Sequence, residues 1–239
     1  MKIQLISSLL STQVLEGIRS RTGQYPAYAV QKFYRVLAEG FVKNGVSVEV
    51  VSNPPAFAST DKFVKFVSDT ENGITYKYMP FINKSIFRHL SLFLNGFWTC
   101  FKFGHSKLED KAIICDVLCY STCMGAIIAA KLTGTKIVGL VTDMPWLVDE
   151  DGVISAKMRM LYGFQKWYIH KYSHYIFLTE QMNEPINIKH RPYQVIEGFA
   201  NIDMEKMDNP LTGKEAPKQI MYAGFLQAKY GLKMLVDGF

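Results

Sequence analysis

The chain has 239 residues, of which 49% are hydrophobic and 20% are charged. This composition supplies a sizeable core and excludes a globally disordered protein, and the length suits one large α/β domain or two small ones. The net charge of +6 and the pI of about 9.0 favour anionic partners such as phosphates or lipid headgroups. Charge that serves only solubility is an equally good explanation, because the sequence has no dense run of lysine and arginine.

Four cysteines without a secretion signal indicate reduced thiols and a cytoplasmic protein. Three of them recur at every fourth residue, at Cys115, Cys119 and Cys123. This spacing does not fit a pair of C-x-x-C zinc knuckles, and cysteines on a buried strand behave as small hydrophobic residues. We therefore expect buried thiols and no metal site. Of the two apolar stretches, 90–101 is too short for a membrane span and 113–130 is interrupted by polar residues.

The first half of the chain alternates strand and helix patterns. We predict a strand at 3–6, a polar loop at 7–24, a helix at 27–43 and a second parallel strand at 46–51. The loop contains arginines that could meet an anion. Two alternating segments follow, at 62–68 and 74–79, and are joined around Asn72-Gly73, which is a strong hairpin signal.

Residues 84–103 form a predicted helix that is rich in aromatic side chains. The favoured interpretation is a helix of the core, whose aromatic side chains are buried. The alternative is a helix that lies at a membrane surface, with its aromatic side chains beside cations such as Arg88 and Lys102. If the alternative holds, the aromatic stripe, Trp98 included, should be partly exposed.

The stretch 111–146 organises the rest of the chain. It contains an apolar strand at 112–118, a helix at 124–132 that Ser121 and Thr122 could cap, and a second buried strand at 136–141. Strand, helix and strand with short links form a βαβ unit. Asp143 leaves the second strand at the carboxyl edge of the sheet, where ligands gather in open parallel sheets, and is the candidate catalytic residue. Its alternative role is to cap the turn that follows.

The second half continues with the same two patterns. We predict a helix at 156–172, strands at 175–179 and 193–197, a polar linker at 210–217, a strand at 219–223 and a helix at 232–236. One sheet should therefore contain the strands near Ile3, Val48, Ile114, Val138, Phe177 and Val195. The predicted fold class is α/β, a Rossmann-like, mainly parallel sheet with helices on both faces.

The sequence contains no G-x-S-x-G elbow, no Walker A loop and no G-x-G-x-x-G fingerprint. Hydrolases of the elbow type, P-loop nucleotidases and dinucleotide-binding domains of the common type therefore lose their main support. An unrelated flavodoxin-like or nucleotide-binding domain stays as a weaker interpretation.

Four stretches carry a resemblance to a known family: QKFYRVLAEGFVKNGVSVEVVS, VTDMPW, FLTEQMNEPINIKHRPYQVIEGFANIDM and IMYAGFLQAKYGLKMLVDGF. In order and spacing they resemble the family 4 glycosyltransferases, which have the two-domain GT-B architecture, over nearly the whole chain. The last stretch resembles the strand, turn and helix that open the family's nucleotide-sugar-binding domain. The resemblance implies that residues 1–209 are an acceptor-side domain and that 210–239 are a linker and the first strand–helix unit of the donor-binding domain.

The resemblance implies an activity, a retaining sugar transfer of the hexosyltransferase type from a nucleotide-sugar donor, without a metal or other cofactor. The expected acceptor is a saccharide or a lipid-linked molecule of bacterial surface polysaccharide or glycolipid synthesis. The expected location is the cytoplasm, with contact to the inner face of an anionic cell membrane, and no nucleic acid is expected as a partner. The alternative is an acceptor- or membrane-binding subunit that needs a separate donor-binding partner.

The resemblance also implies site residues. Asp143 stands where the family often has a histidine and is the expected catalytic residue. The expected acceptor-binding residues are Tyr120, Ser121, Thr122 and Trp146. The expected donor-binding residues are Gly23, Glu197, Gly198, Gly224 and Lys229.

The chain departs from the family's pattern at several positions. The loop after the first strand lacks the family's paired glycines. The usual arginine after the glycine of the second domain is Phe225, and the usual lysine is Tyr230, which leaves Lys229 as the nearest cation. The family's paired donor-binding glutamates would lie beyond Phe239, so we expect this chain alone to transfer no sugar.

Overall fold

The structure is a computed structural model, and it describes residues 1–144, 156–199 and 232–238. The chain separates into two units, Met1–Asn201 and Ile202–Phe239, and each is described by itself. The first unit contains the β-sheets of the described residues.

In the second unit, the described residues form helix α7 (Leu232–Gly238), where the sequence pattern predicts a helix. The predicted linker at 210–217 and the predicted strand at 219–223 lie outside the described residues. Within the part of the chain that the structure describes, no helix is both long and apolar enough to cross a bilayer.

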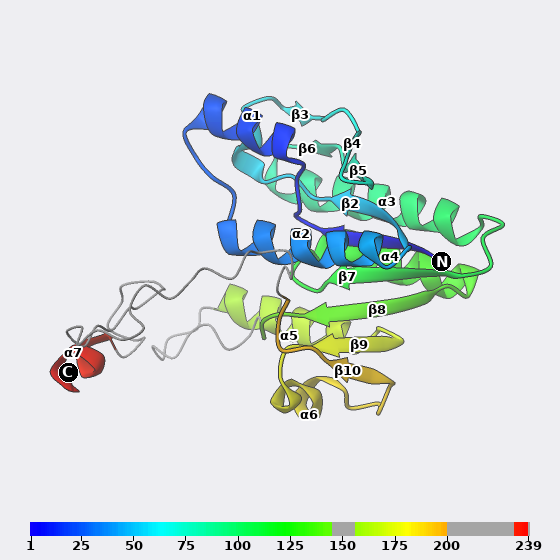
Figure 1. Ribbon diagram of the computed structural model, residues 1–239, viewed down its shortest axis with the longest axis vertical. Helices are drawn as coiled ribbons and strands as arrows, with labels where there is room; N and C mark the ends of the chain where they lie inside the picture. Colours follow the sequence, from blue (N-terminus) through cyan, green and yellow to red (C-terminus); the bar gives the residue numbers. More distant parts are fainter. Residues whose placement is uncertain (145–155, 200–231, 239) are drawn as a thin grey trace, which may run out of the picture. The chain divides into compact units, whose positions relative to one another are not determined.

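The main sheet has eight strands in the order β10-β9-β8-β7-β1-β2-β5-β4 (Figure 1). Its strands are β1 (Lys2–Ser7), β2 (Ser47–Ser52), β4 (Asp69–Glu71), β5 (Ile74–Tyr78), β7 (Lys111–Asp116), β8 (Lys136–Val141), β9 (His174–Phe177) and β10 (Tyr193–Val195). All neighbours are parallel except β4 and β5. The predicted Rossmann-like, mainly parallel sheet is therefore confirmed.

Strand order reverses at the centre of this sheet. Ile3 of β1 lies opposite Val48 of β2 on one side and opposite Ala112 of β7 on the other. Strands β2, β5 and β4 therefore lie on one side of β1, and β7, β8, β9 and β10, which come later in the sequence, lie on the other. Such a reversal creates a crevice beyond the carboxyl ends of the two central strands, where ligands bind in doubly wound sheets.

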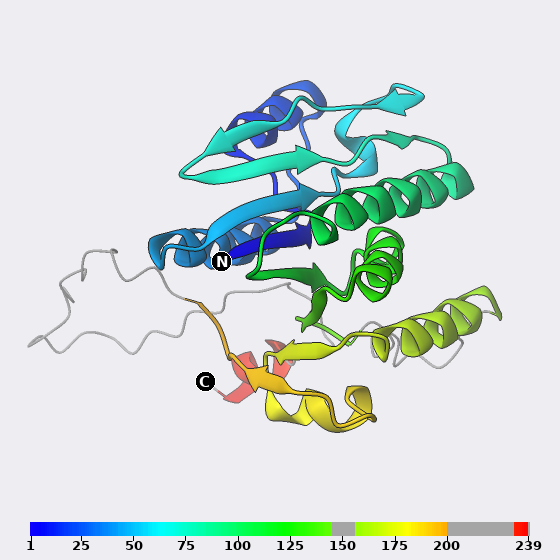
Figure 2. The ribbon, with the colours of Figure 1, turned by 90° about the vertical axis from the view of Figure 1, so that its right-hand side faces the viewer.

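Helices cover both faces of the sheet. Figure 2 shows α2 (Tyr28–Lys43) on one side and α3 (Ser85–Gly104), α4 (Tyr120–Thr133) and α5 (Ala156–Ile169) on the other. Side chains of the central strands alternate between the two cores: Ile114 packs in the cluster that includes α2, whereas Ile113 and Cys115 pack in the cluster that includes α3 and α4. Short elements complete the unit: η1 (Ala56–Ala58), β3 (Phe63–Val64), β6 (Phe81–Ile82), η2 (Glu180–Met182) and α6 (Asn183–Ile186).

The prediction of a loop at 7–24 is wrong, because Thr12–Thr22 forms helix α1. The Ser11 hydroxyl caps this helix by accepting a hydrogen bond from the Val14 amide at 3.4 Å, and Gly23 ends it with a left-handed φ of 67°. Only Leu15 and Ile18 of α1 are buried. An apolar face of two residues is too short to be recognised as helical periodicity in the sequence.

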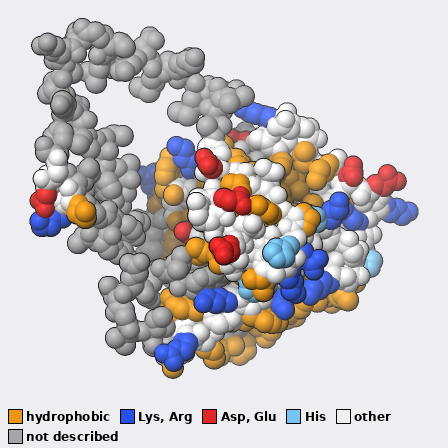
Figure 3. Space-filling model, turned by 90° about the horizontal axis from the view of Figure 1, so that it is seen from below, with side chains coloured by type: hydrophobic (Ala, Val, Ile, Leu, Met, Phe, Trp, Pro, Cys, Tyr) orange, Lys and Arg blue, Asp and Glu red, His pale blue; other side chains and the backbone are white. Residues whose placement is uncertain are grey.

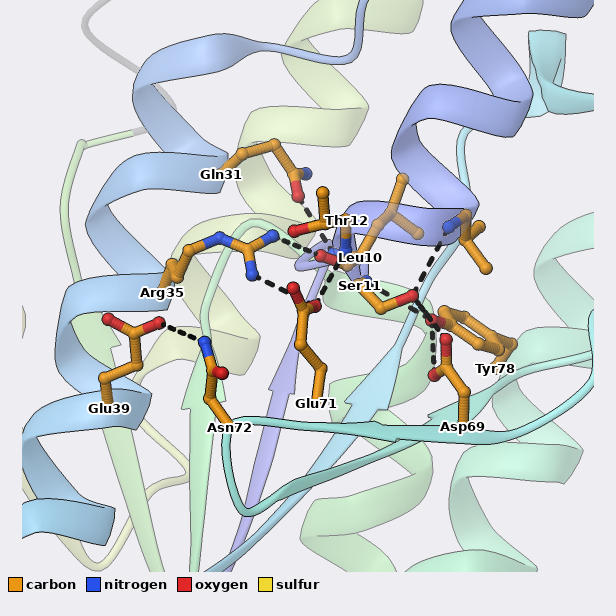
Figure 4. Close-up of polar contacts among 11 residues, drawn as sticks. Leu10, Ser11, Thr12, Gln31, Arg35, Glu39, Asp69, Glu71, Asn72 and Tyr78 are labelled. Atoms are coloured by element: carbon orange, nitrogen blue, oxygen red, sulfur yellow. Dashed lines mark hydrogen bonds and ion pairs between the residues drawn. The ribbon is translucent and has the colours of Figure 1, made fainter.

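The start of α1 is fixed by carboxylates from the distant β4 strand (Figure 4). Glu71 accepts a hydrogen bond from the Thr12 amide at 2.8 Å and pairs with the Arg35 guanidinium at 3.3 Å. Asp69 bonds the Ser11 hydroxyl and accepts from the Tyr78 hydroxyl. The positive end of α1 is therefore occupied by the protein's own acidic side chains.

The hairpin around Asn72-Gly73 is confirmed, with left-handed φ angles of 52° and 76° at the two turn residues. The first strand of the hairpin is β4 (Asp69–Glu71), which is shorter than the predicted strand at 62–68 and begins after it in the sequence. Of the expected segment 62–68, only Phe63–Val64 forms a strand, and it pairs with β6 rather than with β5. Strand β5 also pairs in parallel with β2, which joins the hairpin to the main sheet.

Helices α3 and α4 pack with their backbones in contact. A Cβ added at Gly125 would meet the Phe93 carbonyl oxygen, and one added at Gly96 would lie 2.7 Å from the Thr122 carbonyl oxygen. Glycine is therefore required at both positions for the helices to approach this closely. The first turn of α4 therefore lies beside the second and third turns of α3, where His89 meets Ser121 and Gly96 meets Thr122.

We expect Gly125→Ala to destabilise the fold by about 1–3 kcal/mol or more, because the added methyl group meets backbone atoms that cannot rotate away. Gly163→Ala in α5 is the matched control, since nothing lies within 4 Å of its Cβ position. The control should gain about 0.5–1 kcal/mol from helix propensity. Urea unfolding measures both, and equal effects at the two sites would contradict the close packing of α3 on α4.

Candidate functional site

A cavity of 480 Å³ opens at the carboxyl edge of the sheet, where the strand order reverses. Ser8 follows β1, Asn53 follows β2 and Asp116 ends β7, and all three line it. Helices α2, α3 and α4 supply the remaining walls, and further lining residues include Gln31, Leu92 and Leu118. The cavity thus occupies the position at which doubly wound sheets bind ligands.

The start of α4 forms one wall of the cavity. The helix begins earlier than predicted, at Tyr120, so Ser121 and Thr122 lie in its first turn rather than capping it. Cys119 is the N-cap residue, and its side chain caps no backbone amide. Cys119, Tyr120 and Ser121 all line the cavity. An N-terminus without an acidic residue in its first turn offers amide donors and a partial positive charge.

A histidine from α3 meets this helix start. The imidazole Nδ1 of His89 lies 2.8 Å from the Ser121 hydroxyl, and its ring stacks on Tyr120 with centroids 5.3 Å apart. Burial, followed by the charge of neighbouring Arg88, lowers the pKa of His89 below its usual range. The imidazole is therefore neutral at pH 7 and can accept or donate a hydrogen bond in the cavity.

Arg88 brings a fixed positive charge to the same wall. Its guanidinium donates to the Pro54 carbonyl oxygen at 3.3 Å and lies over the Phe81 ring at 4.8 Å. The Nε atom is buried and makes no hydrogen bond within the described residues. Burial lowers the pKa of Arg88, yet an arginine stays charged at neutral pH. A positive group without full compensation suits an anionic ligand group.

Asp116 lies at the floor of the cavity and is 3% exposed. One carboxylate oxygen accepts from the Leu118 amide at 2.9 Å, and the Cys119 thiol lies 3.8 Å from the other. Burial raises the pKa of Asp116 to about 6, and the charge of Asp143 also raises it. The Tyr34 hydroxyl is buried near this carboxyl without a hydrogen bond of adequate geometry, and burial and the Asp116 charge raise its pKa.

Of the predicted acceptor-binding residues, the structure brings Tyr120 and Ser121 together in the cavity. Thr122 is buried, and its hydroxyl donates to the Asn53 side chain at 2.8 Å, which ties α4 to the end of β2. Trp146 lies outside the described residues.

The predicted catalytic residue Asp143 follows β8 at the carboxyl edge of the sheet and is exposed, outside the cavity lining. Among the predicted donor-binding residues, Gly23 ends α1, and Glu197 and Gly198 are exposed after β10. None of these three lines the cavity. Gly224 and Lys229 lie outside the described residues.

Sequence reasoning missed several polar residues of the cavity, among them Asp116, Arg88 and His89. Asp116 is the last residue of a buried strand, and Asp143 follows the end of another. The signal that identified Asp143, an acidic residue at the carboxyl end of a buried strand, therefore also applied to Asp116. Arg88 and His89 gave no such signal, because only the packing of α3 on α4 places them beside the end of β7.

The prediction of buried thiols is confirmed for Cys115 and Cys123 and is wrong in part for Cys119. Cys115 and Cys123 are buried, and Cys119 is partly exposed at the cavity. Burial raises the pKa of Cys115 and Cys119 well above the usual thiol value. Within residues 1–144, 156–199 and 232–238, no group of three or more histidine, cysteine or acidic side chains is placed to hold a metal ion.

The fold and the position of the cavity define a class, a Rossmann-like α/β domain with a cavity at its topological switch point. No protein-family model matches this chain, and no curated protein matches it. Chains of solved structures do match, and one of them is the crystal structure of TcCGT1 in complex with UDP.

The two chains are 11% identical and superpose with a TM-score of 0.46. The similarity covers 90% of this chain and 53% of that one, so this chain spans about half the length of that structure.

The raised pKa of Asp116 predicts a pH dependence of stability. The folded protein holds this proton up to about pH 6, whereas an unfolded aspartate releases it near pH 4, so Asp116 destabilises the fold progressively as the pH rises through that range. We therefore expect Asp116→Asn to be more stable than the wild type by about 2–3 kcal/mol above about pH 7, and to lose that advantage near pH 4.

Urea unfolding of both proteins at several pH values measures this difference. The comparison between the two proteins removes the contributions of titrating groups that do not interact with Asp116. A difference that stays constant across the whole range would contradict a buried, destabilised carboxylate.

Proposed function

We propose that this chain is the acceptor-binding part of a glycosyltransferase that uses a nucleotide-sugar donor. The observation that carries the proposal is the cavity at the switch point, in a domain whose sequence resembles the acceptor-side domain of family 4 glycosyltransferases. Acceptor binding in that family occurs in the amino-terminal domain. The cavity lies in the first unit of the chain, within the predicted acceptor-side domain at 1–209.

The side chains of the cavity suit a hydroxylated and phosphorylated acceptor. The Tyr120 ring is a flat surface for the apolar face of a sugar, and the neutral His89 and the Ser121 hydroxyl can exchange hydrogen bonds with sugar hydroxyls. Arg88 and the start of α4 suit a phosphate or diphosphate group. Asp116 could accept a hydrogen bond from an acceptor hydroxyl at the cavity floor.

The reaction that we propose is a transfer with retention at the anomeric carbon, in the synthesis of a bacterial surface polysaccharide or glycolipid, on the cytoplasmic side of the membrane. Asp143 would orient the acceptor hydroxyl or the transferred sugar as a donor-binding domain closes over this edge. The donor-binding role proposed for Gly23, Glu197, Gly198, Gly224 and Lys229 rests on the family resemblance.

The alternative function is an acceptor-binding subunit that works with a separate donor-binding partner. The cavity is compatible with both functions, because both require acceptor recognition at the same place. Binding of a nucleotide-sugar by the chain alone distinguishes them, since a self-sufficient enzyme must bind its donor and a subunit need not.

We expect the chain to bind a saccharide diphosphate carrying a short alkyl chain more tightly than the same saccharide without phosphate. Arg88→Gln should weaken binding of the diphosphate about tenfold or more, because a charge-assisted hydrogen bond contributes about 1.5–3 kcal/mol. Isothermal titration calorimetry measures both affinities.

Arg159→Gln is the control, since Arg159 is an exposed cation of α5 outside the cavity. Thermal unfolding of the Arg88→Gln protein separates a local loss of binding from a loss of the Pro54 and Phe81 contacts. Equal losses in the two variants, or no binding of either compound, would argue against an acceptor site in this cavity.

In a protein that also carries the donor half, Asp143→Asn should lower turnover by about a hundredfold or more, the usual scale for a positioned acid–base group. Its thermal stability should change little, because Asp143 is exposed. Steady-state kinetics and a melting curve of the same preparation measure both. Turnover within a factor of a few combined with a lower melting temperature would identify Asp143 as a turn cap and remove it from the mechanism.

A further inference from the structure

The three helices on one face of the sheet, α3, α4 and α5, contain no aspartate or glutamate. Their charged residues are all basic, and those with a described side chain are Arg88, Lys102, Lys131, Arg159 and Lys166. The helices of the opposite core differ, since α1 contains Glu16 and α2 contains Glu39. The charge on the α3–α4–α5 face is therefore of one sign, within a chain that has 21 acidic residues.

Helix α3 also presents an apolar stripe to solvent. Ile86, Leu90, Leu94 and Trp98 recur at four-residue spacing and are 77%, 51%, 45% and 55% exposed. Four-residue spacing places them on one side of the helix. The opposite side of α3 is used for packing, where Gly96 contacts α4. The prediction that α3 is a helix is confirmed. The favoured interpretation of its aromatic residues as buried is wrong for Phe87 and Trp98, which are exposed, and of the predicted aromatic residues only Phe103 is buried.

The apolar surface continues over the other two helices. Ile128 and Leu132 of α4 are exposed, and so are Phe164 and Trp167 of α5. The Tyr120 and Phe164 rings lie 6.3 Å apart, edge to face, and connect α4 to α5. In Figure 3 this side of the molecule forms the lower margin, where hydrophobic side chains gather beside lysine and arginine side chains.

Exposed apolar side chains at this density require an occupant, because burying each one in an apolar environment is favourable. A second copy of the same face is a poor occupant, because a two-fold interface would bring cations against cations. An anionic lipid surface satisfies both features at once. Tryptophan and phenylalanine enter the headgroup boundary, and lysine and arginine meet the lipid phosphates.

We infer that the α3–α4–α5 face docks on the surface of an anionic lipid bilayer. Trp98 and Trp167 enter the headgroup region, and Lys102 and Lys131, both exposed, meet lipid phosphates. The Lys171 ammonium group, 4.4 Å from the centre of the Trp167 ring, adds a further cation at this edge. The docking requires no sugar donor or acceptor, so it stands independently of the glycosyltransferase proposal.

Co-sedimentation of the full chain with two kinds of vesicle tests the inference, one of phosphatidylcholine and one of phosphatidylcholine and phosphatidylglycerol in equal parts. We expect binding to the anionic vesicles only. Binding should fall at least tenfold as the salt rises from about 0.1 M to about 1 M, because the Debye length shrinks from about 10 Å to about 3 Å.

Two double variants separate the apolar and charged contributions. Trp98→Ala with Trp167→Ala should weaken binding about tenfold or more. Lys102→Gln with Lys131→Gln should weaken it about 25-fold and flatten its salt dependence, since each cation near an anionic surface contributes a factor of about five. The matched control is Tyr28→Ala with Lys32→Gln on α2, whose side chains are exposed on the opposite face, and it should bind as the wild type does.

Binding that is equal on both kinds of vesicle, or that the α2 control loses as strongly as the tryptophan variant, would overturn the inference. So would a protein that binds no vesicle but forms a dimer that the tryptophan variant dissociates, as measured by analytical ultracentrifugation, because the face would then be an interface between copies. Circular dichroism of each variant excludes misfolding as the cause of a loss.

Discussion

The contact between the backbones of α3 and α4, at Gly96 and Gly125, is the constraint on which the cavity and the exposed face both depend. Because no side chain separates the two helices there, the first turn of α4 lies against the stretch of α3 from His89 to Gly96. Arg88 and His89 therefore reach the carboxyl edge of the sheet and close the cavity. Because one side of α3 packs on α4, the apolar stripe from Ile86 to Trp98 lies on the opposite side of the helix and is exposed to solvent.

The acidic and basic side chains of the cavity come from different elements, Asp116 from β7 and Arg88 and His89 from α3. Asp116 lies at the floor, where burial raises its pKa to about 6, so a carboxylate is held there against its preference for water. Arg88 and the neutral His89 lie nearer the helix ends. A ligand with hydroxyls at one end and a phosphate at the other matches this order. Helices α3 and α4 supply walls of the cavity and also carry the basic, apolar face.

Periodicity and turn chemistry predicted most of the fold from the sequence. Apolar runs such as 112–118 and 136–141 marked the buried parallel strands, because residues buried on both sides leave no alternation. Asn72-Gly73 marked the hairpin, since both residues tolerate a left-handed backbone. Helix α1 was missed because its start is stabilised by Asp69 and Glu71, which are far away in the sequence. A sequence pattern within residues 7–24 cannot indicate a hydrogen-bond partner that lies on β4.

The sequence by itself determined the order of the strands of the parallel sheet and of most helices, the class of the sheet and the carboxyl edge as the place for a site. These follow from local periods of two and 3.6 residues and from the handedness of βαβ crossovers. Only the tertiary structure decided that Arg88, His89 and Asp116 share one cavity and that the stripe on α3 faces solvent. An apolar stripe looks the same in a sequence whether it meets a core or water, because its environment is set by the shapes of helices that pack against it from elsewhere in the chain.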